Sequence, residues 1–420
     1  MFFFFFENKE PMYRVWHSSE GFADYIIAKT CLKNKNVVKA KMYESDTSKP
    51  KNFHTMPDHI KQILYLDAPD IIVEYNSEPI FSIEESKEAG TGHNAFQRFA
   101  RLAASVENNV PALYLYPEAA IISRKGESTR WDSINPLVMK GLNSIMNIYG
   151  IPALLFYYPT DYRSCPDAKK SKLIGRKGIK YDKNIDFMDC PDSTDAQMQK
   201  LFRVIDDIIH SVEKNGVIKA REGLLGLRSI QEQRQFMEKE FVLKEGNDGM
   251  SPLTATVIVP TDYLLNHLSQ YEDDTYKIGE LLRSRNETVL YQVNAGFRGD
   301  PYPGALAAID YLRCREGKTF EERKYNLVLC WGNVDVDNEN EIINISSNKC
   351  SVNDFVADVQ TCGDKNLLTK DYNELRVFEI PRYYMQVRYG SMFSKSKHIR
   401  VYSYFADAIL FKDGALWRDA

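Results

Sequence analysis

The sequence predicts an α/β (α+β) protein, with a mixed central sheet flanked by helices and a second α/β or α+β domain after it. Three successive features predict this class: a hairpin-like pair of short apolar runs, an amphipathic helix, and a buried apolar run. Strands and helices in this order form a sheet with helices on its faces. A chain of 420 residues is long enough for two such domains.

The first predicted helix covers residues 18–31. Ser18 or Ser19 can cap it, and Glu20 lies in the first turn, where a carboxylate is favourable. The Lys-rich stretch 33–54 that follows is predicted to form loop and edge structure.

The clearest local pattern is a β-hairpin. Asp70 begins the run Ile-Ile-Val-Glu-Tyr-Asn, which is rich in β-branched residues and typical of a buried strand. Turn-forming residues occupy 76–79, and 80–85 is the second strand. Apolar residues at helical spacing then predict a helix over 93–108, and 112–116 reads as a third, buried strand.

The rest of the first half adds mostly helices. A second helix–strand unit is predicted near 133–158, and helices are predicted over 194–214 and 217–241. Between them, the segment 167–183 carries seven Lys or Arg residues against two Asp, and it is expected to be an exposed loop.

The domain boundary is expected between residues 215 and 252, where 244–252 is rich in turn-forming residues. The predicted domains are 1–215 and 216–420. In the second, helices are expected at about 275–286 and 304–314, with a Gly- and Pro-rich loop before the latter. The predicted strands of this domain are 254–260, 326–332, 376–380, 399–404 and 407–411.

Composition narrows the classes of function. The net charge of −4 excludes a polycation held to nucleic acid by bulk charge, so nucleic-acid binding would need local basic patches. The seven cysteines are scattered and include no C-x-x-C pair, which argues against a zinc site and indicates a reducing compartment. No run of about 18 apolar residues exists to span a membrane.

The apolar start, Met1 to Phe6, is too short for a signal peptide and lacks a basic leader, so it is expected to be a first strand. Together with the cysteine pattern, this predicts a cytoplasmic protein.

The chemistry is expected at Asp70, Glu85 and Lys87. Asp70 begins one strand of the hairpin, and Glu85 and Lys87 end the other. Alternate strand residues share a face, so Glu85 and Lys87 point the same way and Asp70 can meet them. Two carboxylates placed in this way suit Mg²⁺, and a lysine beside them can orient a water and stabilise a pentacovalent phosphate.

This arrangement resembles the PD-(D/E)XK nuclease superfamily, which includes most type II restriction endonucleases. The resemblance covers roughly residues 18–116. It implies that Asp70 and Glu85 hold Mg²⁺, that Lys87 assists the attacking water, and that hydrolysis leaves 5′-phosphate and 3′-hydroxyl ends. It further implies a third metal ligand from the first helix, for which Glu20 is the first choice and Asp24 the second.

Polar residues on the helix after the lysine lie near the phosphate in many members of that superfamily, and the basic segment 167–183 could add phosphate contacts. The alternative for Asn94 is a helix cap, the alternative for Arg98 is exposure to solvent, and the alternative for the segment 167–183 is a solvated loop. Glu74 has the strand parity of Asp70 and is a possible extra ligand. The residues assigned to nucleic-acid binding are Asn94, Gln97, Arg98, Lys169, Lys170, Lys172, Arg176 and Lys177.

The leading functional hypothesis is a sequence-specific endonuclease that cuts double-stranded DNA. Two cuts need two active sites, so a homodimer is expected. The alternatives are a nuclease of low specificity, acting in repair, transposition or phage defence, and a non-catalytic nucleic-acid-binding module. RNA and single-stranded substrates stay open.

Overall fold

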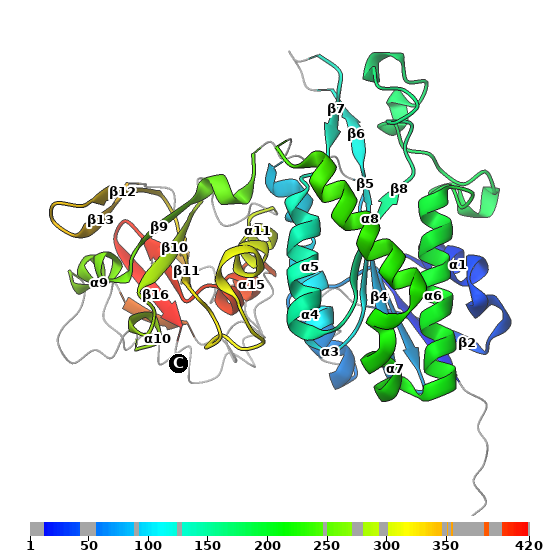
Figure 1. Cartoon of the computed structure of the whole chain (residues 1–420), viewed down its shortest axis with the longest axis horizontal. Coiled ribbons are helices and arrows are strands. Elements are labelled where there is room, and N and C mark those ends of the chain that lie inside the picture. The colour runs from blue at the N-terminus through cyan, green and yellow to red at the C-terminus, as the bar shows by residue number, and fades with distance from the viewer. Residues whose placement is uncertain are drawn as a thin grey trace, which may run out of the picture.

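The computed structural model describes residues 12–42, 56–87, 92–123, 128–246, 250–270, 280–293, 301–346, 351, 354–355, 382–385 and 397–418. The strands predicted at 1–6 and 376–380 lie outside these ranges, as does much of the predicted loop 33–54. Two six-stranded mixed sheets, each with flanking helices, dominate the structure (Figure 1). The predicted fold class is therefore confirmed.

The first sheet has the strand order β2-β1-β3-β4-β5-β8. The strands β1, β3 and β4 are antiparallel neighbours, whereas β4, β5 and β8 run parallel. The carboxyl ends of β4, β5 and β8 therefore meet at one edge of the sheet. The bounds are β1 Tyr13–His17, β2 Val37–Lys41, β3 Ile71–Tyr75, β4 Glu78–Glu85, β5 Ala112–Pro117 and β8 Ala153–Tyr158.

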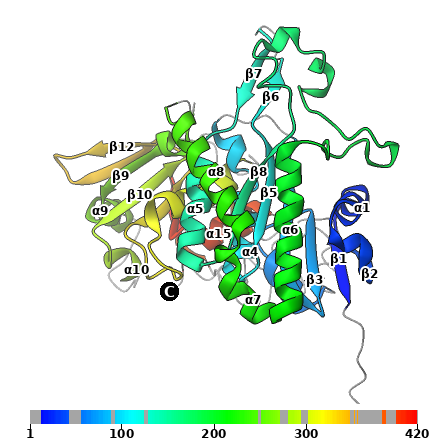
Figure 2. The same cartoon turned by 45° about the vertical axis from the view of Figure 1, so that its right-hand side comes forward.

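Helices cover both faces of this sheet, with α4 and α5 on one face and α6 on the other (Figures 1 and 2). The helix α8 packs on the edge strand β8 and contacts both α5 and α6. The bounds are α1 Glu20–Lys29, α3 Asp58–Leu64, α4 Phe99–Glu107, α5 Leu137–Tyr149, α6 Ala196–Asn215, α7 Val217–Gly223 and α8 Arg228–Lys244. A short hairpin of β6 (Ala119–Ile122) and β7 (Arg130–Ser133) projects from the sheet edge (Figure 1).

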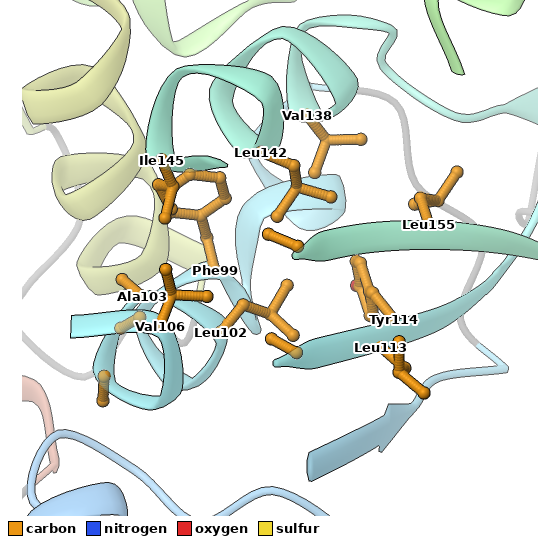
Figure 3. Close-up of a cluster of buried hydrophobic side chains, with 14 of the residues drawn as sticks. Phe99, Leu102, Ala103, Val106, Leu113, Tyr114, Val138, Leu142, Ile145 and Leu155 are labelled. Carbon is orange, nitrogen blue, oxygen red and sulfur yellow. The ribbon is translucent and has the colours of Figure 1, made fainter. Parts of the chain in front are cut away.

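Buried apolar side chains hold the α4–α5 layer against the sheet. Leu102 from α4, Leu142 from α5 and Leu155 from β8 lie within one cluster (Figure 3). Each is at most 1% exposed, and a buried leucine stabilises the fold by roughly 1.5–3 kcal/mol. This layer fixes the strand edge from which the predicted site residues project.

The second sheet has the order β14-β16-β15-β11-β10-β9, and a separate hairpin, β12–β13, lies beside it. Its strands are β9 Thr256–Pro260, β10 Glu287–Gln292, β11 Asn326–Cys330, β14 Arg382–Met385, β15 Ala408–Phe411 and β16 Gly414–Arg418, with β12 Asn333–Asp337 and β13 Ile342–Ser346 in the hairpin. The accompanying helices are α9 Thr261–Ser269, α10 Glu280–Arg283, α11 Pro301–Ile309 and α15 Lys397–Phe405, and a π-helical turn follows α11.

Several predicted elements differ from the structure. The helix predicted over 217–241 is divided into α7 and α8, and α11 begins at Pro301, inside the predicted Gly- and Pro-rich loop. The strand predicted at 399–404 is wrong, because these residues lie in the helix α15, which packs against α11. Five of these six residues are buried, so the segment shows neither the alternation of a half-exposed strand nor an exposed helical face. The helix predicted over 93–108 is α-helical only from Phe99 to Glu107, after a 3₁₀ turn at Gly92–Phe96.

A continuous apolar core joins the two sheets through α4, α11 and α15. At Gly304 of α11, an added Cβ would lie 1.9 Å from the main-chain oxygen of Phe96, so the two backbones touch. The partly buried Glu107 of α4 accepts hydrogen bonds from the hydroxyls of Tyr311 and Tyr404. Two helices beyond the predicted division at 215 belong with the first sheet: α8 packs on β8, and α7 packs on α6.

Within the described ranges, no helix combines the length and the apolar character needed to cross a membrane.

Candidate active site

Asp70 is fixed at the point where three strands meet. Its main-chain oxygen accepts a hydrogen bond from the Ser18 amide at 2.9 Å, which extends the β1–β3 pairing by one step. Its carboxylate accepts from the Ser18 hydroxyl at 3.0 Å and from the Glu85 amide at 2.7 Å. Asp70 is therefore held between the ends of β1 and β4, and its carboxylate lies against the main chain of the second predicted acidic residue.

Glu85 and Lys87 project together from the end of β4. The Lys87 Nζ lies 3.5 Å from Glu85 Oε1, and the Glu85 side chain is only 13% exposed. Burial raises the pKa of Glu85 to about 7; Lys87 opposes this shift and the nearby Asp70 adds to it. The structure thus brings Asp70, Glu85 and Lys87 together, in a setting that penalises the ionised form of Glu85.

Lys87 is surrounded by groups that the motif does not reveal. Its ammonium donates a hydrogen bond to the main-chain oxygen of Asp189, and it lies 5.4 Å and 5.9 Å from the ring centroids of Tyr181 and Tyr158. Cations near aromatic faces are held electrostatically at such distances. The sequence gives a signal for Tyr158 alone, since it ends the run 153–158 and parallel strands end at one edge.

The predicted third ligand is engaged elsewhere. Glu20 and Asp24 accept hydrogen bonds from the same ammonium, that of Lys39, at 2.7 Å and 2.8 Å. The Glu20 side chain is 66% exposed. No group of three or more His, Cys, Asp or Glu residues that could hold a metal is found in the described part of the chain. The role of Glu20 as a metal ligand stays a prediction.

Glu74, the possible extra ligand, lies near the far end of β3 from Asp70. It is fully buried, contacts His59 through Oε1 and lies 3.7 Å from Arg14 through Oε2. Four residues along a strand span about 13 Å. Glu74 therefore acts in an ion pair away from the site.

The residues present fit a hard divalent cation. Glu85 Oε1 is buried, its nearest cation is the Lys87 ammonium at 3.5 Å, and no geometric hydrogen bond satisfies it in the described residues, so it can accept a further ligand. Mg²⁺ is commonly held by one or two carboxylates together with waters and substrate phosphates. Asp70 and Glu85 would hold it here.

The polar residues predicted on the helix after Lys87 differ in their surroundings. Arg98 Nε lies 3.4 Å from Glu84 Oε1, and the Arg98 side chain is 20% exposed. Asn94 and Gln97 are half-buried near the start of α4. Arg98 is thus tied to a buried carboxylate next to the site, and nucleic-acid contact by these three residues stays a prediction.

The basic segment reaches the site. All five cationic side chains assigned to nucleic-acid binding there are exposed, and the expected loop contains short 3₁₀ turns and isolated β-bridges at Ile179 and Tyr181. The Arg176 guanidinium lies 5.7 Å from the Tyr181 ring, on which Lys87 also rests. Arg176 of this segment and Lys87 therefore approach the same tyrosine ring. These five residues are Lys169, Lys170, Lys172, Arg176 and Lys177.

Comparison with known proteins gives no family assignment: no protein-family model, no curated protein and no solved structure matches this chain. The site must therefore be argued from its own geometry.

The raised pKa of Glu85 predicts how the stability depends on pH. In the unfolded chain this carboxyl ionises near pH 4.3, but in the folded protein it ionises near 7. Folding therefore takes up a proton between these values, and the free energy of unfolding falls as the pH rises through this window. We expect Glu85→Gln to be more stable than the wild type by about 3–4 kcal/mol at pH 8 without Mg²⁺, and to show little difference at pH 4.

Urea unfolding at both pH values measures this difference. Adding Mg²⁺ at pH 8 is expected to stabilise the wild type and to leave Glu85→Gln nearly unchanged, because the ionised carboxylate is the form that binds the metal. Equal pH dependence in both proteins would show that Glu85 has an ordinary pKa.

Proposed function

We propose that this protein is a Mg²⁺-dependent endonuclease that hydrolyses phosphodiester bonds of double-stranded DNA, with a PD-(D/E)XK-type site. The observation that carries the proposal is the convergence of Asp70, Glu85 and Lys87 at one sheet edge, with the ammonium of Lys87 3.5 Å from Glu85. Two carboxylates and a lysine at the end of a hairpin are suited to phosphoryl chemistry.

In this proposal each residue has a defined role. The carboxylates of Asp70 and Glu85 hold Mg²⁺, which when bound lowers the pKa of a water and offsets charge on the phosphate. Lys87 orients the attacking water and stabilises the negative charge that develops on the phosphate oxygens. The water oxygen forms a bond to phosphorus, the bond to the 3′-oxygen breaks, and the products are a 5′-phosphate and a 3′-hydroxyl.

The basic segment 167–183 supplies the phosphate contacts in this proposal. Among its exposed cations, Arg176 lies 5.7 Å from the Tyr181 ring that Lys87 also approaches, so a strand bound at Arg176 would pass close to the site. The net charge of −4 makes such a local track necessary. The second sheet would serve recognition or dimerisation, and a homodimer would supply one site for each strand.

The test is cleavage of an unmethylated phage genome by the purified full chain, with Mg²⁺ or with EDTA. Discrete bands that need Mg²⁺ would support a sequence-specific, restriction-type enzyme. A Mg²⁺-dependent smear would support a nuclease of low specificity. Intact DNA with both Mg²⁺ and Mn²⁺ would overturn the endonuclease proposal and favour a non-catalytic binding module.

A further inference from the structure

A cavity of about 310 Å³ opens at the carboxyl ends of β5 and β8. It lies between the end of β8, the start of α6 and the basic segment, at the sheet edge where the predicted catalytic residues end β4. Its size is at the lower end of the range for small-molecule sites. The lining residues are Glu118, Tyr157, Tyr158, Pro159, Thr160, Arg163, Ser164, Lys180, Asp195, Ala196, Gln197 and Phe236.

The cavity shares a wall with the candidate active site. Tyr158 lines the cavity, and its ring centroid lies 5.9 Å from the Lys87 ammonium. The pKa of the Tyr158 hydroxyl is raised, first by burial and second by the charge of the Glu85 carboxylate. Tyr158 therefore lies close to Glu85 as well as to Lys87. A group in the cavity would therefore contact a residue whose buried ring lies close to Lys87.

The walls combine aromatic surface with hydrogen-bond donors. Tyr157 and Phe236 form an edge-to-face pair with centroids 5.4 Å apart, and the Tyr157 hydroxyl is fixed by a 3.0 Å hydrogen bond to Glu240. The Gln197 side-chain oxygen accepts from the main chain of Tyr157 at 3.5 Å and from Gln233 at 3.3 Å, which leaves its amide NH₂ as a donor.

The charges on the cavity wall leave one cation available. Arg163 is bound to Glu118 at 2.6 Å, and Asp195 caps α6 by accepting from the Gln197 amide at 2.8 Å. Lys180 forms no ion pair with a carboxylate within the described ranges, and it belongs to the basic segment. The partly exposed ring of Phe236, the NH₂ group of Gln197 and the ammonium of Lys180 match the face, the edge and the phosphate of one nucleotide.

We propose that this cavity receives one unstacked nucleotide of the bound nucleic acid, next to the bond that is cut. This inference rests on the proposed nuclease function, and it specifies the substrate as a strand from which one nucleotide can leave the stack. Enzymes that read a base outside the helix bind it in such pockets, by stacking and by hydrogen bonds to its edge.

The first test measures, by ligand-observed NMR, the binding of the four 2′-deoxynucleoside 5′-monophosphates to the full chain without metal. Ala196 is exposed at the cavity wall, so Ala196→Trp fills the cavity without removing a side-chain hydrogen bond. We expect saturable binding of at least one nucleotide, weakened about tenfold or more by Ala196→Trp and by Lys180→Ala. The matched controls Ala28→Trp and Lys219→Ala, on the exposed faces of α1 and α7, should bind as the wild type does.

The second test uses a DNA duplex with 2-aminopurine at successive positions and the Asp70→Asn variant, which is expected to bind but not to cut. A rise in fluorescence at one position, lost in the Asp70→Asn/Ala196→Trp double variant, would support the inference. No nucleotide binding and no fluorescence rise, in a protein that does cleave DNA, would overturn the inference alone. Nucleotide binding in a protein that never cleaves would overturn the nuclease function and leave the cavity as a nucleotide site.

Discussion

The Lys87→Ala variant is expected to cleave DNA about 10³-fold more slowly than the wild type at saturating Mg²⁺. In the proposed reaction, Lys87 is the charged donor closest to the carboxylates, with its Nζ 3.5 Å from Glu85 Oε1. Negative charge develops in the transition state, and removing one preorganised donor that stabilises this charge typically lowers the rate 10²–10³-fold. Losing the group that orients the attacking water lowers the rate further. Single-turnover cleavage of a short labelled duplex measures the rate of the chemical step.

The fold should tolerate this substitution. The Lys87 side chain is about one-third exposed, and its neighbours are a main-chain oxygen and two aromatic rings. Circular dichroism and the urea midpoint should therefore stay close to the wild type, and duplex binding should weaken only a few-fold. Lys219→Ala, on α7 at the opposite end of the first sheet, is the matched control and should keep full activity (Figure 1).

Unchanged cleavage by Lys87→Ala would remove Lys87 from the mechanism and with it the assignment of this site. Loss of duplex binding in parallel with loss of cleavage would instead make Lys87 a phosphate contact, not a catalytic residue.

The convergence of the three motif residues could be predicted because it depends on local rules. Alternation along a strand places Glu85 and Lys87 on one side, and hairpin pairing returns Asp70 to the same end. Neither rule needs knowledge of distant packing. The same holds for the fold class, which follows from the order of strands and helices.

The surroundings of the site could not be predicted, because they come from remote segments. Tyr181 and Asp189 lie about a hundred residues beyond Lys87, and only tertiary packing brings them to it. Ser18 reads as a helix cap in the sequence, yet its hydroxyl holds Asp70. The cavity beside Tyr158 likewise combines strand ends, a helix start and the basic segment, which share no sequence pattern.

Charged residues in the sequence also mislead about burial. Arg101 lies off the apolar stripe of its helix and reads as a solvated or DNA-facing residue. In the structure it is buried, and it donates to Asp67 at 2.7 Å and to both oxygens of Glu84 at 3.0 Å. Glu84 alternates with Glu85 along β4 and is therefore directed to the other face of the sheet. Sequence patterns separate apolar from charged residues, but they do not show which charges will neutralise one another inside a core.

This buried cluster leads to the largest expected change in stability. Replacing Arg101 with Met keeps most of the volume but removes the cation. Among the described residues, the buried Glu84 then keeps one cationic contact, that to Arg98 at 3.4 Å. Breaking a buried ion pair by removing one partner typically costs 3–5 kcal/mol. We expect Arg101→Met to lower the free energy of unfolding by about that amount at pH 8, measured by urea denaturation.

The pH dependence identifies the cause of this loss. Burial raises the pKa of Glu84, and the charge of Arg101 is the principal force acting against this shift. Without Arg101 the pKa of Glu84 rises further, so folding takes up a proton over a wider range above the unfolded value near 4.3. The difference between Arg101→Met and the wild type should therefore be smallest at pH 4–5 and grow as the pH rises.

A double variant separates the charge from the packing. In Glu84→Gln/Arg101→Met the uncompensated carboxylate is gone, and replacing a buried ion pair as a whole is often close to neutral. Most of the lost stability at pH 8 should return, although Asp67 still loses its 2.7 Å bond to Arg101. A double variant as unstable as Arg101→Met would show that Arg101 stabilises the fold by filling space between α4 and the sheet. Because Glu84 precedes Glu85 on β4, recovery of stability together with recovery of cleavage would show that the uncompensated Glu84 carboxylate, and not the absence of the ion pair, displaces the catalytic strand end in Arg101→Met.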